Sequence, residues 1–139
     1  MANRFYNKGL NRVLSGDLDW DAHDIRVILI DLAGYTPDTA VHEFLADVPA
    51  GARLAQVALP SRTVGVSGVG AGDAGDVVFT AVPAITGGGA AEVLVYYRFV
   101  TADADSPLIA LVDTAPGLPV TPNGGDIRLQ FAPEGVVAV

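Results

Sequence analysis

The chain contains no cysteine, so disulfide bonds and thiolate–metal sites are excluded from the start. Basic residues are also scarce: eight Lys and Arg stand against sixteen Asp and Glu, and the formal net charge is −8. Because an acidic surface repels nucleic-acid phosphates, we expect no binding to DNA or RNA. No stretch approaches the roughly 20 apolar residues that span a bilayer, and the first residues lack the apolar core of a secretory signal. The sequence therefore predicts neither a nucleic-acid nor a membrane partner.

The residues that are abundant indicate a folded chain built from short elements. Half of the 139 residues are hydrophobic and only 17% are charged, which argues against disorder. The 16 Gly and 9 Pro are scattered along the chain, as in proteins whose short strands are joined by turns. This length suits one domain. We expect an N-terminal helix or arm over residues 1–16 and a single β domain over residues 17–139.

Strand patterns dominate the chain beyond residue 24. The run IRVILI (25–30) reads as a buried strand, and EVLVYYRFV (92–100) is the strongest strand signal because it is rich in β-branched and aromatic residues. Further strands are predicted over 54–59, 63–69, 77–82, 108–112, 127–131 and 136–139. Turn signals separate them at the intervals of a sandwich or barrel, and long helices do not alternate with them. The predicted fold class is all-β, a sandwich or barrel-like domain.

Two short helices are expected beside the strands. Residues 3–14 place apolar side chains near one face, with Asn3 as a cap and Ser15-Gly16 as the end: Phe5, Tyr6, Leu10, Val13 and Leu14. Residues 39–48 share a face in the same way, with Thr39 as the cap: Val41, Phe44, Leu45 and Val48. The first helix has two interpretations. It docks on its own domain, or it is an arm that docks on a neighbouring subunit.

Three motifs that resemble chemical sites are incomplete. His42-Glu43 begins a zinc-binding H-E-x-x-H motif, but position 46 is Ala. Asp17, Asp19 and Asp21 have the spacing of the first ligands of a calcium loop, yet the later Gly and Glu are missing. The G-A-G-D tetrapeptide at 70–73 occurs in sugar kinases, which need a longer fold and a nucleotide site. The sequence predicts no catalytic residues, no metal, no cofactor and no enzymatic activity.

The order of several segments resembles a family of small virion proteins encoded by tailed bacteriophages and prophages. The segments are FYNKGL (5–10), LSGDLDW (14–20), IRVILID (25–31), YTPD (35–38), HEFL (42–45), VYYR (95–98), SPLIA (106–110) and GLPVTPNGGD (117–126), followed by IRLQF. The likeness covers nearly the whole chain and departs most over residues 54–75. It implies a non-catalytic virion part made in the bacterial cytoplasm.

The resemblance gives two functional hypotheses. The first is a capsid decoration (cement) protein that binds the major capsid protein on the outer shell, as a homo-oligomer for which we expect a trimer. The second is a tail- or fibre-associated domain that contacts host surface carbohydrate, and such sites expose aromatic rings. Tyr96 and Tyr97 lie in one strand, so we expect one ring to point inward and the other outward. The expected interface lies in the N-terminal segment, where apolar and basic groups meet: Phe5, Tyr6, Lys8, Leu10 and Arg12.

Overall fold

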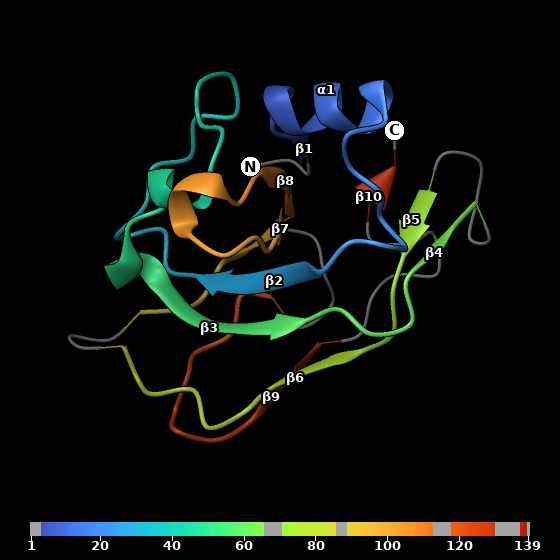
Figure 1. Cartoon of the computed structure of the whole chain (residues 1–139). Helices are drawn as coiled ribbons and strands as arrows, with labels where there is room; N and C mark the ends of the chain where they lie inside the picture. The colour runs from blue at the N-terminus through green and yellow to red at the C-terminus, as the bar shows by residue number, and fades with distance from the viewer. Residues whose placement is uncertain (1–3, 66–70, 86–88, 113–117, 130–136, 139) are drawn as a thin grey trace.

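The structure is a computed structural model that describes residues 4–65, 71–85, 89–112, 118–129 and 137–138. Its centre is a five-stranded antiparallel sheet with the strand order β1-β8-β7-β2-β3. The strands are β1 (Arg4–Phe5), β2 (Ile25–Ile30), β3 (Arg53–Ala58), β7 (Val93–Arg98) and β8 (Leu108–Val112). Figure 1 shows helix α1 (Asn7–Ser15) over the β8 side of this sheet, and β6 and β9 below β3.

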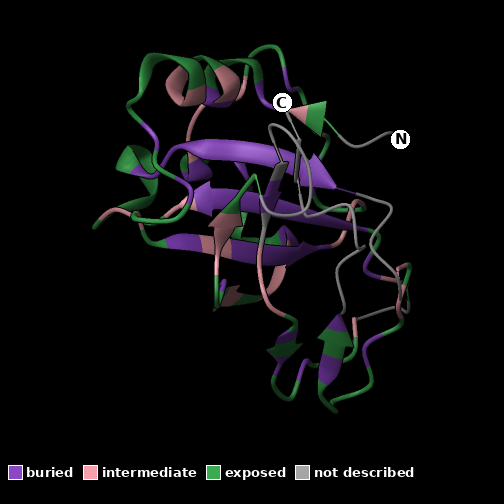
Figure 2. Cartoon of the chain, turned by 90° about the vertical axis from the view of Figure 1, so that its right-hand side faces the viewer, coloured by how far each residue is buried: buried purple, intermediate pink, exposed green. Residues whose placement is uncertain are grey.

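Both faces of the sheet are covered, which explains the continuous apolar runs in its central strands. Every residue of β8 is buried, and so is every residue of β2 except Arg26. In Figure 2 the central strands β2, β7 and β8 are accordingly coloured as buried along most of their length. A strand with only one covered face would alternate apolar and polar residues instead. The main sheet therefore divides the core into two clusters, one on each face.

One core cluster lies between the sheet and several smaller strands. Val27, Leu29 and Tyr96 face this side. Strands β6 (Val77–Phe79) and β9 (Ile127–Leu129) form a two-stranded ribbon that contributes Phe79 and Leu129 to the cluster. A three-stranded sheet of β4 (Thr63–Val64), β5 (Ala71–Asp73) and β10 (Val137–Ala138) lies beside it. The mainly β architecture with two additional small sheets confirms the predicted fold class.

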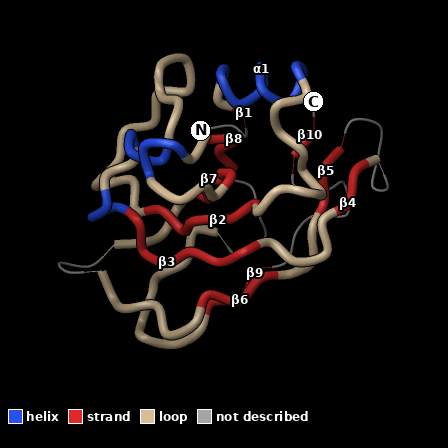
Figure 3. The backbone as a smooth tube through the Cα atoms, viewed as in Figure 1, coloured by secondary structure: helices blue, strands red, loops and turns tan. Residues whose placement is uncertain are grey.

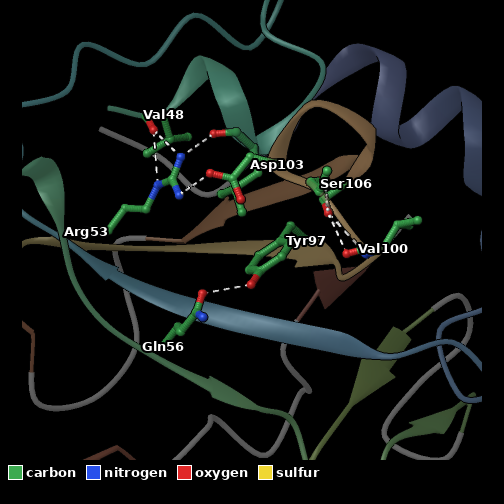
Figure 4. Close-up of polar contacts among 9 residues, drawn as sticks. Val48, Arg53, Gln56, Tyr97, Val100, Asp103 and Ser106 are labelled. Atoms are coloured by element: carbon green, nitrogen blue, oxygen red, sulfur yellow. Dashed lines mark hydrogen bonds and ion pairs between the residues drawn. The ribbon is translucent and has the colours of Figure 1, made fainter. Parts of the chain in front are cut away.

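The other core cluster lies beneath the segment that follows β2. Ile28, Ile30 and Tyr97 face this side, against Tyr35, Leu45 and other side chains of residues 35–52. Three 3₁₀ turns shape the covering loops: η1 (Leu45–Asp47), η2 (Ala50–Ala52) and η3 (Asp103–Asp105). Arg53 holds this cover in place, because its guanidinium donates to the carbonyls of Leu45 at 2.8 Å and Val48 at 2.6 Å and forms an ion pair with Asp103 (Figure 4).

The N-terminal helix is shorter than predicted because its first residues pair with the sheet. Phe5 lies opposite Ala110 in β8, and the Tyr6 N–H donates to the Ile109 carbonyl at 2.9 Å. The helix therefore begins at Asn7, after a residue that provides no side-chain cap. The expected cap, Asn3, lies outside the described residues. The expected end is confirmed, since Gly16 adopts φ +83° and closes the helix.

The second predicted helix, over 39–48, is reduced to the single turn η1. Tertiary hydrogen bonds override the helical pattern: the Leu45 N–H donates to the Ser106 carbonyl, and Phe44 forms a bridge with Pro107. Thr39 caps no helix, because the residues after it form a turn and η1 begins only at Leu45; its carbonyl instead accepts the N–H of Asn7 at 2.8 Å. Asp38 forms an Asx turn, in which its carboxylate accepts the Ala40 N–H at 3.1 Å.

One motif has a structural role, and one further expectation is corrected. Residues Ala71–Asp73 of the G-A-G-D motif form β5, which pairs with β4 and β10, and the indole of Trp20 lies against Gly72. Tyr96 and Tyr97 do point to opposite faces, but both rings are buried because both faces are covered. The predicted strands 63–69, 127–131 and 136–139 extend partly beyond the described residues.

Candidate interface around helix α1

Helix α1 is held against β8 at very short range. Gly9 is buried, and a Cβ atom there would lie 2.4 Å from the Leu108 carbonyl oxygen and 2.9 Å from that of Ile109. Only a residue without a side chain allows such a close approach of a helix to a strand. The helix is therefore a fixed part of the domain.

A buried hydrogen-bond chain anchors the residue before the helix. The hydroxyls of Tyr6 and Tyr35 are 2.8 Å apart, and the Tyr35 hydroxyl is 2.9 Å from His42 Nδ1. The Asp38 N–H also donates to this nitrogen, at 3.2 Å, so Nδ1 is an acceptor and Tyr35 donates to it. Tyr6 in turn donates to Tyr35. Burial raises the pKa of both Tyr6 and Tyr35, which keeps the two phenols neutral as this chain requires.

Glu43 ties the 38–44 loop to the helix. Its carboxylate pairs with Arg12 at 2.7 Å and with Lys8 at 3.2 Å. These two cations hold the pKa of Glu43 below its usual value, Arg12 through the stronger hydrogen bond. The Arg12 guanidinium also lies 5.1 Å from the centroid of the Phe44 ring. Helix and loop therefore present one continuous surface.

The same loop is fixed from its other end by Asp47. Its carboxylate accepts the backbone N–H groups of Glu43 at 2.8 Å and Phe44 at 3.1 Å. These bonds, led by that of Glu43, hold the pKa of Asp47 below its usual value. The position of the Glu43 carboxylate is thus set by the backbone as well as by its cations.

The outward side of this surface is a shallow, open hollow of about 310 Å³. Polar and charged side chains line it: Lys8, Asn11, Arg12, Ser15, Asp17 and Glu43. Leu14 lies on the flank of α1 away from Lys8 by helical spacing, and it is 70% exposed. Val41, in the loop that carries Glu43, is 64% exposed. We call the outward side chains of α1 together with the 38–43 loop the α1 surface.

The five expected interface residues do not all belong to the α1 surface. Lys8 is exposed on it, and Arg12 is half-buried and paired with Glu43. Phe5 and Leu10 are half-buried, and Tyr6 is completely buried in the core of its own chain. Tyr6 is therefore not a surface group, which corrects the interpretation of an arm whose large side chains seek a neighbour. The sequence reasoning missed Val41 and Glu43, because only the fold brings their loop to the helix.

The other candidate sites have structural roles. The Nδ1 atom of His23 accepts the Asp19 N–H at 2.9 Å, and so closes the acidic loop after α1. Within that loop a hydrogen bond between the carboxyl groups of Asp19 and Asp21 lowers the pKa of Asp19 and raises that of Asp21. Across the residues that the structure describes, no group of three or more His, Asp or Glu side chains is arranged to hold a metal ion.

Among the described residues, no helix combines the length and the apolar character needed to cross a membrane.

Comparison with known proteins does not assign the chain to a family. No protein-family model matches the chain, and no curated protein matches it either. The resemblance to phage virion proteins therefore rests on the order of the sequence segments alone. The α1 surface is the candidate site that the structure itself supplies.

Proposed function

We propose that the chain is a non-enzymatic virion structural protein that decorates a phage capsid, binding the major capsid protein on the outer shell through the α1 surface. The observation that carries this proposal is the exposure of Leu14. It is the most exposed of the large apolar side chains in the described part of the chain, and it lies on a helix fixed tightly to the sheet. A rigid surface with an exposed apolar group beside polar ones suits protein association.

The charges of the α1 surface support the same partner class. Lys8 and Arg12 are two of only eight basic residues in a chain of net charge −8. Lys8 is about half exposed despite its pairing with Glu43, so it remains available to an acidic neighbour. Weak single contacts suffice on a shell, because many identical sites act together.

The distribution of aromatic rings favours the capsid over host carbohydrate. Among the described residues Phe99 is the one exposed aromatic side chain, at 38%. The guanidinium of Arg26 lies 3.7 Å from the centroid of that ring and covers one of its faces. A tail or fibre domain that stacks sugars on rings would offer more open aromatic surface.

The test has two parts. We expect the chain in hundreds of copies per purified particle, and we expect the isolated protein to bind particles that lack it. Leu14→Asp should abolish this binding without changing the melting temperature. The control is Val78→Asp, which alters a side chain 43% exposed on β6, away from the α1 surface.

Two results would reject the proposal. One is undiminished binding of the Leu14→Asp protein to the particles. The other is a copy number of only a few per particle together with binding to host polysaccharide, which would identify the tail or fibre alternative.

A further inference from the structure

The loop that precedes β9 is bonded to the chain that follows β6. Figure 3 shows β6 and β9 side by side, with the chain after β6 running beside the chain before β9. The Gly124 N–H donates to the Val82 carbonyl at 2.8 Å, and the Val82 N–H donates to the Gly125 carbonyl at 3.0 Å. The Asp126 carboxylate accepts the Ala81 N–H at 2.8 Å. These hydrogen bonds fix the loop to the ribbon of β6 and β9.

Asn123 places a chemically labile amide in this loop. Asparagine is among the residues whose side chains degrade most readily with heat. The Oδ1 atom of Asn123 accepts the Gly125 N–H at 3.0 Å, which makes an Asx turn. The next residue is Gly124, which has no side chain to hinder the approach of its backbone nitrogen to the Asn123 side-chain carbonyl carbon. Residues 123–126 are exposed, so water reaches the amide.

We propose that Asn123 is a site of spontaneous deamidation. The backbone nitrogen of Gly124 loses its proton and attacks Cγ of Asn123, and a C–N bond forms. The side-chain nitrogen then leaves with that proton as ammonia, so that a succinimide remains. Water opens the succinimide at either carbonyl and gives aspartate or isoaspartate. The balance is one water consumed and one ammonia released, with no change of oxidation state.

The Asx turn assists the attack on the amide. Negative charge develops on Oδ1 of Asn123 when the Gly124 nitrogen adds to the neighbouring carbon. The Gly125 N–H already donates to this oxygen, so the donor is in place where the charge appears. The turn therefore lowers the barrier to ring closure at this residue.

The hydrogen bond between Gly124 and Val82 opposes the attack and sets its rate. The attacking nitrogen is the one whose N–H is engaged by the Val82 carbonyl, so the loop must open before that nitrogen is free. Residues 123–126 are exposed and belong to neither core cluster, so a local opening frees the nitrogen without global unfolding. The folded protein therefore reacts, but more slowly than the unfolded chain.

The reaction site is tested by incubating the intact protein at mildly alkaline pH, followed by proteolysis and mass spectrometry. We expect the peptide that contains Asn123 to gain the mass of deamidation and to separate into aspartate and isoaspartate forms. Asn7 and Asn11 are internal controls that should stay unmodified, because they lie in α1 and precede residues with long side chains. Asn123→Ser carries no amide and should give no modified form of this peptide. No conversion of Asn123, or equal conversion of Asn7, overturns the proposal.

A pair of variants at Asp126 tests control by the loop. Asp126→Ala removes the acceptor of the Ala81 N–H, so the loop should open more often. We expect conversion of Asn123 to rise about fivefold, the factor that corresponds to one ordinary hydrogen bond. The matched variant Asp126→Asn keeps an acceptor oxygen and should react at nearly the unmodified rate, and the unmodified chain in denaturant should react faster than it does when folded. Equal rates for the two variants, or no acceleration on unfolding, would reject control by the loop. The inference is independent of the proposed capsid function.

Discussion

Gly9 shows how a single residue fixes the candidate interface to the sheet. In most helix interiors Gly→Ala stabilises by roughly 0.5–1 kcal/mol. Here a Cβ would lie 2.4 Å from a backbone oxygen that cannot move without disturbing β8, so we predict the opposite sign. Gly9→Ala should destabilise the protein by about 1–3 kcal/mol, the usual cost of overpacking, and lower the melting temperature. Gly51→Ala is the control, because its Cβ would meet nothing within 4 Å. Equal melting temperatures for the two variants would refute the close packing of α1.

At the scale of elements, residues 1–14 are predicted to stabilise the monomer. β1 covers the outer edge of β8, and Tyr6 is fully buried. Burying one such side chain is worth roughly 1.5–3 kcal/mol. We expect a protein that begins at Ser15 to melt at a lower temperature or to fail to fold. Tyr6→Phe, which loses only the hydroxyl bonded to Tyr35, should show a smaller decrease. An unchanged melting temperature after truncation would instead support a detachable arm.

The elements that the sequence predicted well are those with strong local signals. β2 and β8 have the predicted bounds because each is a short apolar run between turns. β1 was not predicted, because two residues are too few to show a hydrophobic period. β5 was not predicted either, because Gly72 lies in a strand only through pairing with neighbouring strands and packing against the Trp20 ring. For the candidate interface, Lys8 and Arg12 were identified as basic groups. Their partner Glu43, 31 residues beyond Arg12, could not be identified from spacing.

For the whole molecule, burial of both sheet faces implies an uneven distribution of stability. β7 and β2 each have a strand on both sides and a core cluster on both faces. Their backbone amides are exposed to solvent only when the two core clusters unfold together. The sheet of β4, β5 and β10 is built from strands of two or three residues, and much of β4 is exposed. The amides of this small sheet become exposed to solvent through local openings, which cost less free energy than global unfolding.

Native-state hydrogen exchange measures this difference. We expect the amides of β7 and the inner amides of β2 to exchange at the rate of global unfolding, and those of β4 and β5 to exchange much faster. Because local openings expose little surface, low denaturant should accelerate exchange in β7 and β2 but leave β4 and β5 nearly unaffected. Uniform exchange across all these strands would mean that the small sheet unfolds with the main one. The two cores and the small sheet would then be a single cooperative unit, and the argument from strand length and burial would be wrong.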